Sequence, residues 1–341
     1  MPRFSGHEQP KKPVWGYEDE SDPAVMARKL DAAADHGLSA FIFCWYYHAQ
    51  GDFMERALHD GYLKAANRER LPFAIMWANH DIAPIGRMGA VTPEVFEKMT
   101  EHIVRDYFSR PEYWRVGGKC YFSIYEPQTF IRGMGGVAPA RAALEAFRRK
   151  AGDSGCGGIH LNLVDWQLLS LPNALLPVRE LGADSITSYV WIHTTGLPIF
   201  PTNDYQDIGR AYFANWDQWW VHTSIHFPHV SMGWDPTPRL RPDQPHTGLG
   251  GYPDQAVIVN NTPVHFKAAL EEAKARAQKL PAGRRIVTLY AWNEWSEGGY
   301  LEPEERTGNG YLEAIKDVFL PGAREVGPSL LSPPVDPTHS K

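Results

Sequence analysis

Two glutamates three residues apart, Glu294 and Glu297, could carry acid-base chemistry. Cleavage of a glycosidic bond needs one carboxyl that protonates the leaving oxygen and one ionised group that stabilises or creates the oxocarbenium-like centre. Repulsion between two neighbouring carboxylates, and burial of one of them against apolar rings, make the pKa values of the two carboxyls differ. We therefore expect Glu294 and Glu297 to be catalytic, with Trp292 and Asn293 beside them in contact with substrate. The alternative is that these acids open a surface helix and complement its dipole.

The segment just before the glutamates is a short β-branched and aromatic run, residues 286–292. It is bounded by a Pro- and Gly-containing stretch before it and by Gly298 and Gly299 after it. Such a run is typical of a buried strand. The two carboxyls are therefore predicted to lie where a buried strand ends.

The same order, a helix and then a strand that ends in polar residues, recurs along the chain. Helix starts are marked by a cap residue followed by proline, as at Asp22-Pro23 and Thr92-Pro93. The expected strands are 40–48, 73–77, 120–125, 159–164, 185–191, 229–234 and 286–292. The expected helices are 23–36, 53–65, 92–108, 139–151, 178–181, 205–221, 262–279 and 308–319.

This alternation predicts an α/β fold with parallel strands and helical crossovers, in particular a (β/α)8 TIM barrel. The order begins with a helix, so the barrel is expected to lack its first strand. A doubly wound open sheet is the competing fold, but it would need a Gly-rich phosphate loop after an early strand. The predicted organisation is an N-terminal arm at 1–21, the barrel at 22–320 and a Pro-rich tail at 321–341.

In a TIM barrel the site lies where the strands end, so the residues that follow each strand are candidates for substrate binding. Most of these residues are aromatic or carry hydrogen-bonding groups, a mixture that suits a carbohydrate-binding cleft. The alternative for any one of them is that it packs in the core or supports a neighbouring side chain. The loops 196–205 and 235–261 would shape the mouth or be surface insertions. The expected binding residues are Trp45, Tyr46, Tyr47, Trp77, Asn79, His80, Asp81, Tyr125, Glu126, Tyr189, Trp191, Trp234, Asp235, Trp292 and Asn293.

Composition limits the possible partners and the compartment. The net charge is −6 without a long basic cluster, which argues against nucleic acid and anionic membranes. The start lacks the apolar core of a secretory signal, and Cys44, Cys120 and Cys156 show no paired spacing, so a cytoplasmic location is expected. No ligand spacing suggests a metal, and we expect no cofactor.

The segment 292–298 resembles glycoside hydrolase family 99 and the larger group of family-99-like, WbsX-type proteins. The resemblance to the WbsX group extends over nearly the whole chain, through Trp15-Gly16-Tyr17, Met76-Trp77-Ala78-Asn79 and Tyr125-Glu126-Pro127. It implies a barrel glycosidase that acts on α-mannoside-type or related linkages with retention of configuration. Serine at Ser296, where the characterised enzymes tend to have histidine, and Cys44, where WbsX-type relatives often have an acid, depart from the pattern.

The resemblance also implies roles for both glutamates. Glu294 would be the base that removes the proton from the sugar's own 2-hydroxyl, giving an epoxide-like anhydro sugar. Glu297 would be the acid/base at the glycosidic oxygen. The leading hypothesis is thus hydrolysis of an oligo- or polysaccharide. A glycosyltransferase of polysaccharide biosynthesis and a non-catalytic glycan-binding barrel are the alternatives.

Overall fold

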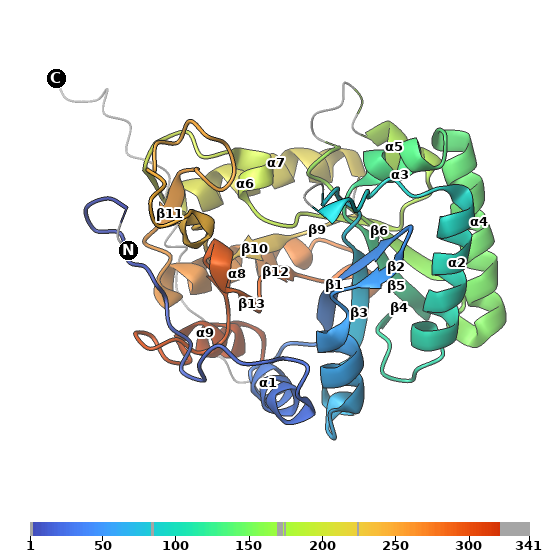
Figure 1. Ribbon diagram of the computed structural model, residues 1–341, viewed down its shortest axis with the longest axis horizontal. Helices are drawn as coiled ribbons and strands as arrows, with labels where there is room; N and C mark the ends of the chain where they lie inside the picture. Colours follow the sequence, from blue (N-terminus) through green and yellow to red (C-terminus); the bar gives the residue numbers. More distant parts are fainter. Residues whose placement is uncertain (1–2, 83–84, 169–172, 174, 224, 321–341) are drawn as a thin grey trace.

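The computed structural model describes residues 3–82, 85–168, 173, 175–223 and 225–320 (Figure 1). Its centre is a sheet in the strand order β2-β1-β3-β5-β6-β7-β9, with helices around the outside. The strands of this sheet are β1 (Phe41–His48), β2 (Gly51–Phe53), β3 (Phe73–Trp77), β4 (Arg115–Val116), β5 (Lys119–Ile124), β6 (Ile159–Val164), β7 (Ser185–Thr187) and β9 (His226–Phe227). The strands from β1 to β9 in this order pair in parallel, whereas β2 and β4 pair antiparallel with β1 and β5.

The sheet continues beyond β9 through a second parallel pair. Only Pro228 separates β9 from β10 (His229–Ser231), and β10 pairs with β12 (Thr288–Tyr290) in the register Val230 to Leu289. Proline cannot donate to a strand ladder, which accounts for the interruption. The predicted α/β fold with parallel strands in barrel order is thus confirmed.

The arc of strands is open between its two ends. Among the described residues, β12 and β1 share no backbone pairing, and the Phe41 and Trp292 rings meet across the opening at 5.0 Å between centroids. We call this opening, flanked by β1 and β12, the seam. It lies where the sequence predicts that a barrel strand is missing.

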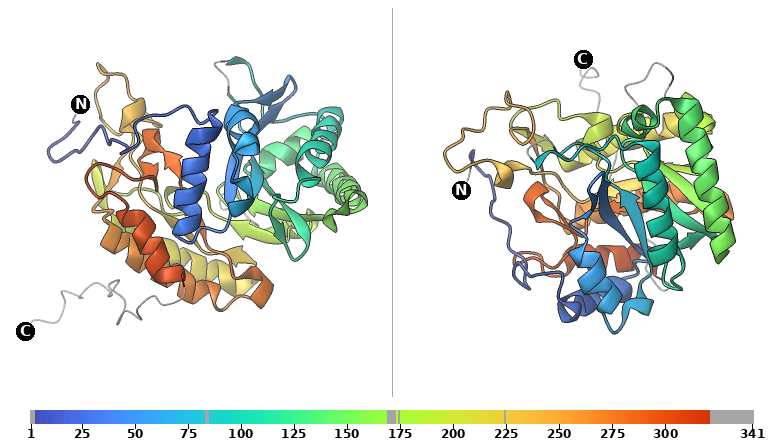
Figure 2. Two further views of the ribbon diagram at one scale, coloured as in Figure 1. Left: turned by 90° about the horizontal axis from the view of Figure 1, so that it is seen from below. Right: turned by 45° about the vertical axis from the view of Figure 1, so that its right-hand side comes forward.

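The helices follow one another around the outside of the strands. α2 lies beside α4, and α8 packs against α9 (Figure 2). The longer helices are α1 (Pro23–Asp35), α2 (Pro93–Ile103), α4 (Val137–Ala151), α7 (Tyr205–Thr223), α8 (Pro263–Ala277) and α9 (Gly310–Phe319). The shorter ones are α3 (Pro127–Gly133), α5 (Leu175–Glu180) and α6 (Ile192–Thr195).

Capping explains where three of the helices begin. The Asp22 side chain accepts a hydrogen bond from the Ala24 amide (2.8 Å), and Thr92 and Thr262 accept from amides three residues ahead. A proline follows each of these caps, where its missing N–H costs nothing. These starts are as predicted from the sequence.

Several local predictions were wrong. The stretch predicted as a helix at 53–65 instead contains the end of the β1–β2 hairpin, the π-turn η1 (Ala57–Gly61) and a 3-10 turn. The two predicted loops contain a short parallel pair, β8 (Thr202–Asp204) and β11 (Val257–Val259). Cys120 and Cys156, which showed no paired spacing, form a disulfide. The predicted tail at 321–341 lies outside the described residues.

Among the described helices, none is both long and apolar enough to cross a bilayer.

Candidate active site

Glu294 and Glu297 lie just beyond β12, on opposite sides of a tight turn. Glu294 ends β13 (Asn293–Glu294), which pairs with β14 (Gly299–Tyr300), and Glu297 ends the 3-10 turn η9 (Trp295–Glu297). Gly298 closes the turn with φ of 68°, and a Cβ there would lie 2.8 Å from the Asp235 amide nitrogen. Glycine is therefore required for the chain to fold back here.

One guanidinium, that of Arg239, joins the two carboxylates. Its Nη2 lies 2.8 Å from Oε1 of Glu294, and its Nη1 lies 3.1 Å from Oε1 of Glu297. Burial opposes the charge on Arg239, but the Glu297 and Glu294 carboxylates outweigh it and raise the Arg239 pKa. Both carboxyls therefore converge on one place.

Hydroxyl groups complete the surroundings of the two glutamates. Tyr252 donates to Oε1 of Glu297 (2.7 Å), and Tyr290 donates to Oε2 of Glu297 (2.5 Å). Ser296 donates to Oε1 of Glu294 (2.8 Å) and accepts from Arg239 (2.8 Å). The Glu297 side chain is 11% exposed and that of Glu294 is 33% exposed, so Glu294 is the more open of the two.

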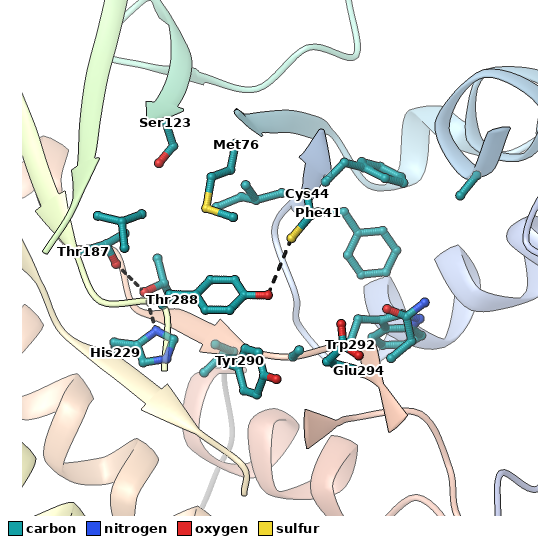
Figure 3. Close-up of a pocket in the computed structure, with 18 of the residues that line it drawn as sticks. Phe41, Cys44, Met76, Ser123, Thr187, His229, Thr288, Tyr290, Trp292 and Glu294 are labelled. Atoms are coloured by element: carbon teal, nitrogen blue, oxygen red, sulfur yellow. Dashed lines mark hydrogen bonds between the residues drawn. The ribbon is translucent and has the colours of Figure 1, made fainter. Parts of the chain in front are cut away.

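A cavity of about 410 Å³ adjoins Glu294 (Figure 3). Its wall includes Glu294, Tyr290 and Trp292, and Glu297 is linked to it through Tyr290. Consecutive residues of β1, Phe41 to Cys44, also line it. Neighbouring residues of a strand point to opposite faces, so a cavity that touches all of them must pass along the strand's edge, which here is the seam.

A series of rings runs along the ends of the strands beside the cavity. Consecutive members lie 5.0–6.4 Å apart between centroids. Burial raises the pKa of the four tyrosines, so their hydroxyls stay protonated and can donate hydrogen bonds. In order, the series is Tyr46, His80, Tyr125, Tyr189, Tyr290 and Trp234.

The sequence family described as Glycosyltransferase WbsX matches residues 1–315. The chain belongs to the WbsX family. The uncharacterized protein WxcX of Xanthomonas campestris pv. campestris is 26% identical to it, in strain B100 and in strain ATCC 33913 alike. Each alignment covers 98% of this WbsX-family chain and 46% of WxcX, so the chain spans about half the length of these relatives.

Solved structures show the same fold. A structure titled glycoside hydrolase-like protein superposes with a TM-score of 0.64 at 13% identity, covering 92% of this chain and 90% of the other. The GH99 endo-alpha-mannosidase from Bacteroides thetaiotaomicron superposes with a TM-score of 0.55 at 16% identity, covering 92% and 88%. The WbsX-family chain therefore has a glycoside hydrolase-like fold.

Some of the aromatic residues predicted to bind substrate pack away from the cavity in this WbsX-family chain. Trp45 and Tyr47 point to the opposite side of β1 from Tyr46 and stack on each other at 5.4 Å. Trp77 is fully buried against Phe96 and Phe130, and Trp191 is fully buried against Tyr205 and Tyr212. These four residues contribute to packing beside the site.

The predicted polar residues are likewise held by neighbours. Asn79 and Glu126 join the ends of β3 and β5 through two hydrogen bonds of 2.7 and 2.9 Å. Asp81 accepts from the Gly89 amide, and Asn293 donates to Glu20. Asp235 binds the N-terminal arm, accepting from Gln9 (2.8 Å) and pairing with His7 (3.0 Å).

Sequence reasoning did not find Arg239, Tyr252 or Tyr290. Arg239 and Tyr252 belong to a loop rich in proline and glycine, where no periodicity or motif marks them. Tyr290 was part of a predicted strand and was assigned no contact. Tyr290 lies two residues before Trp292 in the run predicted as a strand at 286–292, and alternate residues of a strand share a face, which is the signal that could have indicated it.

Proposed function

We propose that this WbsX-family chain is a glycoside hydrolase that cleaves an oligo- or polysaccharide at an α-mannoside-type or related linkage. Glu294 and Glu297 are the catalytic pair, and the reaction retains the anomeric configuration. The observation that carries the proposal is the convergence of both carboxyls on Arg239 at the rim of an aromatic-lined cavity. The glycoside hydrolase-like fold supports it further.

In the first step, Glu294 takes the proton of the sugar's 2-hydroxyl, and the resulting oxygen attacks the anomeric carbon. The bond from that carbon to the leaving oxygen breaks as Glu297 donates a proton to the leaving oxygen. In the second step, Glu297 takes a proton from a water molecule. The water oxygen attacks the anomeric carbon and breaks the bond from that carbon to the 2-oxygen. Glu294 then returns its proton to the 2-oxygen, so both glutamates recover their starting states.

The surroundings of each glutamate suit these roles. Glu294 lines the cavity and is the more exposed, so a sugar hydroxyl can approach it. Glu297 is held by the hydroxyls of Tyr252 and Tyr290, which fix its orientation. Preorganised donors of this kind account for much of the rate enhancement in many enzymes. Arg239 contacts both glutamates, and we expect it to keep these contacts when a sugar approaches Glu294 from the cavity.

The family's description favours a second candidate, transfer of a glycosyl group to an acceptor hydroxyl. The same two carboxyls could serve it if a sugar hydroxyl replaced water in the second step. A non-catalytic glycan-binding barrel, with the seam spoiling the site, is the third. Product analysis separates these functions because only hydrolysis consumes water.

The test is release of reducing sugar from α-mannans and bacterial exopolysaccharides. We expect release by the native chain, and loss of activity in Glu294→Gln and Glu297→Gln. The matched control is Glu313→Gln, since Glu313 on α9 is 54% exposed and lies at a surface ion pair. Elongated products would favour glycosyl transfer, and binding without turnover would favour a non-catalytic glycan-binding barrel. Full activity in Glu297→Gln would refute the role of Glu297 as the acid/base.

A further inference from the structure

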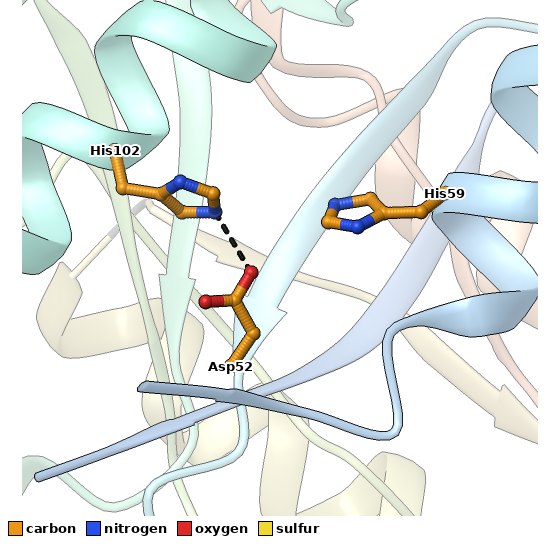
Figure 4. A group of neighbouring side chains, drawn as sticks. All are labelled: Asp52, His59 and His102. Atoms are coloured by element: carbon orange, nitrogen blue, oxygen red, sulfur yellow. Dashed lines mark ion pairs between the residues drawn. The ribbon is translucent and has the colours of Figure 1, made fainter. Parts of the chain in front are cut away.

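Three side chains from different elements point toward one another (Figure 4). Asp52 comes from β2, His59 from η1 and His102 from the last turn of α2. Trp45, which points away from the cavity, stacks on His102 at 5.9 Å between centroids. This cluster is therefore separate from the paired glutamates.

The three residues offer nitrogen and oxygen donors in one place. One donor atom from each lies within 4.8 Å of the others. Oδ2 of Asp52 is 3.1 Å from Nε2 of His102, yet that buried nitrogen has no hydrogen bond of acceptable geometry among the described residues. In a tetrahedral zinc site with bonds of about 2.0–2.1 Å, two ligand atoms lie about 3.3 Å apart. Asp52 and His102 thus already have ligand spacing, and His59 has to move closer.

Neighbouring groups hold both imidazole rings. Oδ2 of Asp106 lies 2.7 Å from Nδ1 of His102, and the Tyr107 hydroxyl lies 2.5 Å from Nε2 of His59. Carboxylates and hydroxyls that orient the rings are usual around metal-bound histidines. If His59 binds through Nε2, the Tyr107 hydroxyl must turn aside.

The local charge favours a cation. Asp52 and Asp106 bring two carboxylates, and Arg105, which pairs with Asp106 and contacts Nδ1 of His102 at 3.2 Å, brings one positive charge. With neutral imidazoles, one negative charge remains. The competing interpretation is that Asp52 and Asp106 hold His102 directly, without an ion.

We propose that Asp52, His59 and His102 bind one divalent transition-metal cation of the Zn²⁺ class. Two imidazoles and one carboxylate are a donor set that suits zinc and leaves a fourth position for water. The ion fastens the β1–β2 hairpin to α2 and η1. That hairpin pairs Tyr46, on the cavity wall, with Phe53, so the ion braces one side of the cavity from behind.

The test uses the full chain without an affinity tag, stripped with chelator and titrated with ZnCl₂ in a calorimeter. Bound metal is counted by mass spectrometry. We expect one ion per chain, a rise in thermal midpoint, and at least tenfold weaker binding in Asp52→Asn, His59→Gln and His102→Gln. The matched control is His36→Gln. His36 also pairs with a carboxylate, that of Glu313, but among the described residues it belongs to no three-ligand cluster.

Cobalt(II) gives a readout on the native chain that does not depend on how the variants fold. Visible bands typical of four-coordinate nitrogen and oxygen ligation should appear with Co²⁺ and vanish when Zn²⁺ is added. Absence of bound ion in the native chain, or binding in the Asp52 and His59 variants equal to that in His36→Gln, would overturn the proposal. Asp52 and Asp106 would then hold His102 without an ion.

Discussion

Nη2 of Arg239 lies 2.8 Å from Oε1 of Glu294, although 55 residues separate them in the chain. The contact brings the loop between β10 and β11 onto the end of β12. In each step of the proposed reaction one of the two glutamates is ionised, and an ionised carboxylate in this partly buried site is unfavourable without a counter-charge. The loop supplies that charge, so it belongs to the site as much as the strand does.

Replacing Arg239 tests this role. Arg239→Met should lower kcat/KM about 10²- to 10³-fold, the usual effect of removing one group that stabilises a polar transition state. Arg239→Lys should recover little, because an ammonium cannot reproduce the two-armed contact. Initial rates on the best substrate measure both effects. Arg241→Met is the control, since Arg241 is 79% exposed and, among the described residues, forms an ion pair with Asp243 alone. Equal rates in the two Met variants would contradict the role of Arg239.

Removing the phenolic hydroxyls on Glu297 should also slow the reaction. A hydrogen bond to a charged group contributes about 1.5–3 kcal/mol, so Tyr252→Phe and Tyr290→Phe should each lower kcat/KM roughly 10- to 100-fold. Because both hydroxyls act on one carboxylate, the double variant should lose less than the product of the single effects. Tyr17→Phe is the control, because Tyr17 is 69% exposed. Unchanged rates in both variants would separate these tyrosines from catalysis.

The ion pair under the N-terminal arm should matter for stability. Lys29 is buried and lies 2.5 Å from Glu20 and 2.6 Å from Glu302. Lys29→Met leaves Glu302 buried without its partner and should lower the free energy of unfolding by about 3–5 kcal/mol. Adding Glu302→Gln should restore part of that loss.

Urea denaturation measures these changes. The control is Lys12→Met, because Lys12 is 60% exposed and 3.8 Å from Glu305, and such surface pairs contribute at most about 1 kcal/mol. A loss in Lys29→Met no larger than in Lys12→Met would show that the buried pair is neutral.

His229 should make stability depend on pH. Burial lowers its pKa to about 3, with the nearby His226 and His193 acting in the same direction. The unfolded chain takes up this proton near pH 6.5 and the folded chain does not, so stability falls as the pH drops from about 6.5 toward 3. The slope from one histidine is about 1.4 kcal/mol per pH unit.

Unfolding free energies at pH 7, 6 and 5 measure that slope. His229→Asn should reduce the slope by the amount that one histidine contributes. Loss of the 2.9 Å contact between His229 and Thr288 should also make the variant less stable at every pH, but that loss does not change the slope. His36→Gln controls for the loss of an imidazole ring elsewhere in the chain. A slope in His229→Asn equal to that of the native chain would mean that His229 is protonated in the folded state as well.

The core strands could be predicted from the sequence because they are fully buried. The run at 73–77 gave β3 with both ends correct, and all five of its residues are buried. The run at 286–292 gave only β12, three residues long, because its side toward β1 has no pairing partner among the described residues. Apolar composition predicts a strand, whereas its length depends on neighbours that the local sequence does not identify.

The glutamate pair could be found because both acids lie in one short segment. Arg239 could not, because its contact with them depends on how a long loop folds back. The Asp52, His59 and His102 cluster escaped for the same reason, since the three residues come from a hairpin, a π-turn and a helix. Local patterns find sites built from one segment, and tertiary packing decides the others.

The seam has a practical consequence for handling the protein. Along the facing flanks of β1 and β12, amides and carbonyls have no neighbouring strand within the described part of the chain. Unpaired strand borders can template pairing between molecules and lead to aggregation where solvent reaches them. Concentrated samples should therefore be checked by light scattering before rates or affinities are compared.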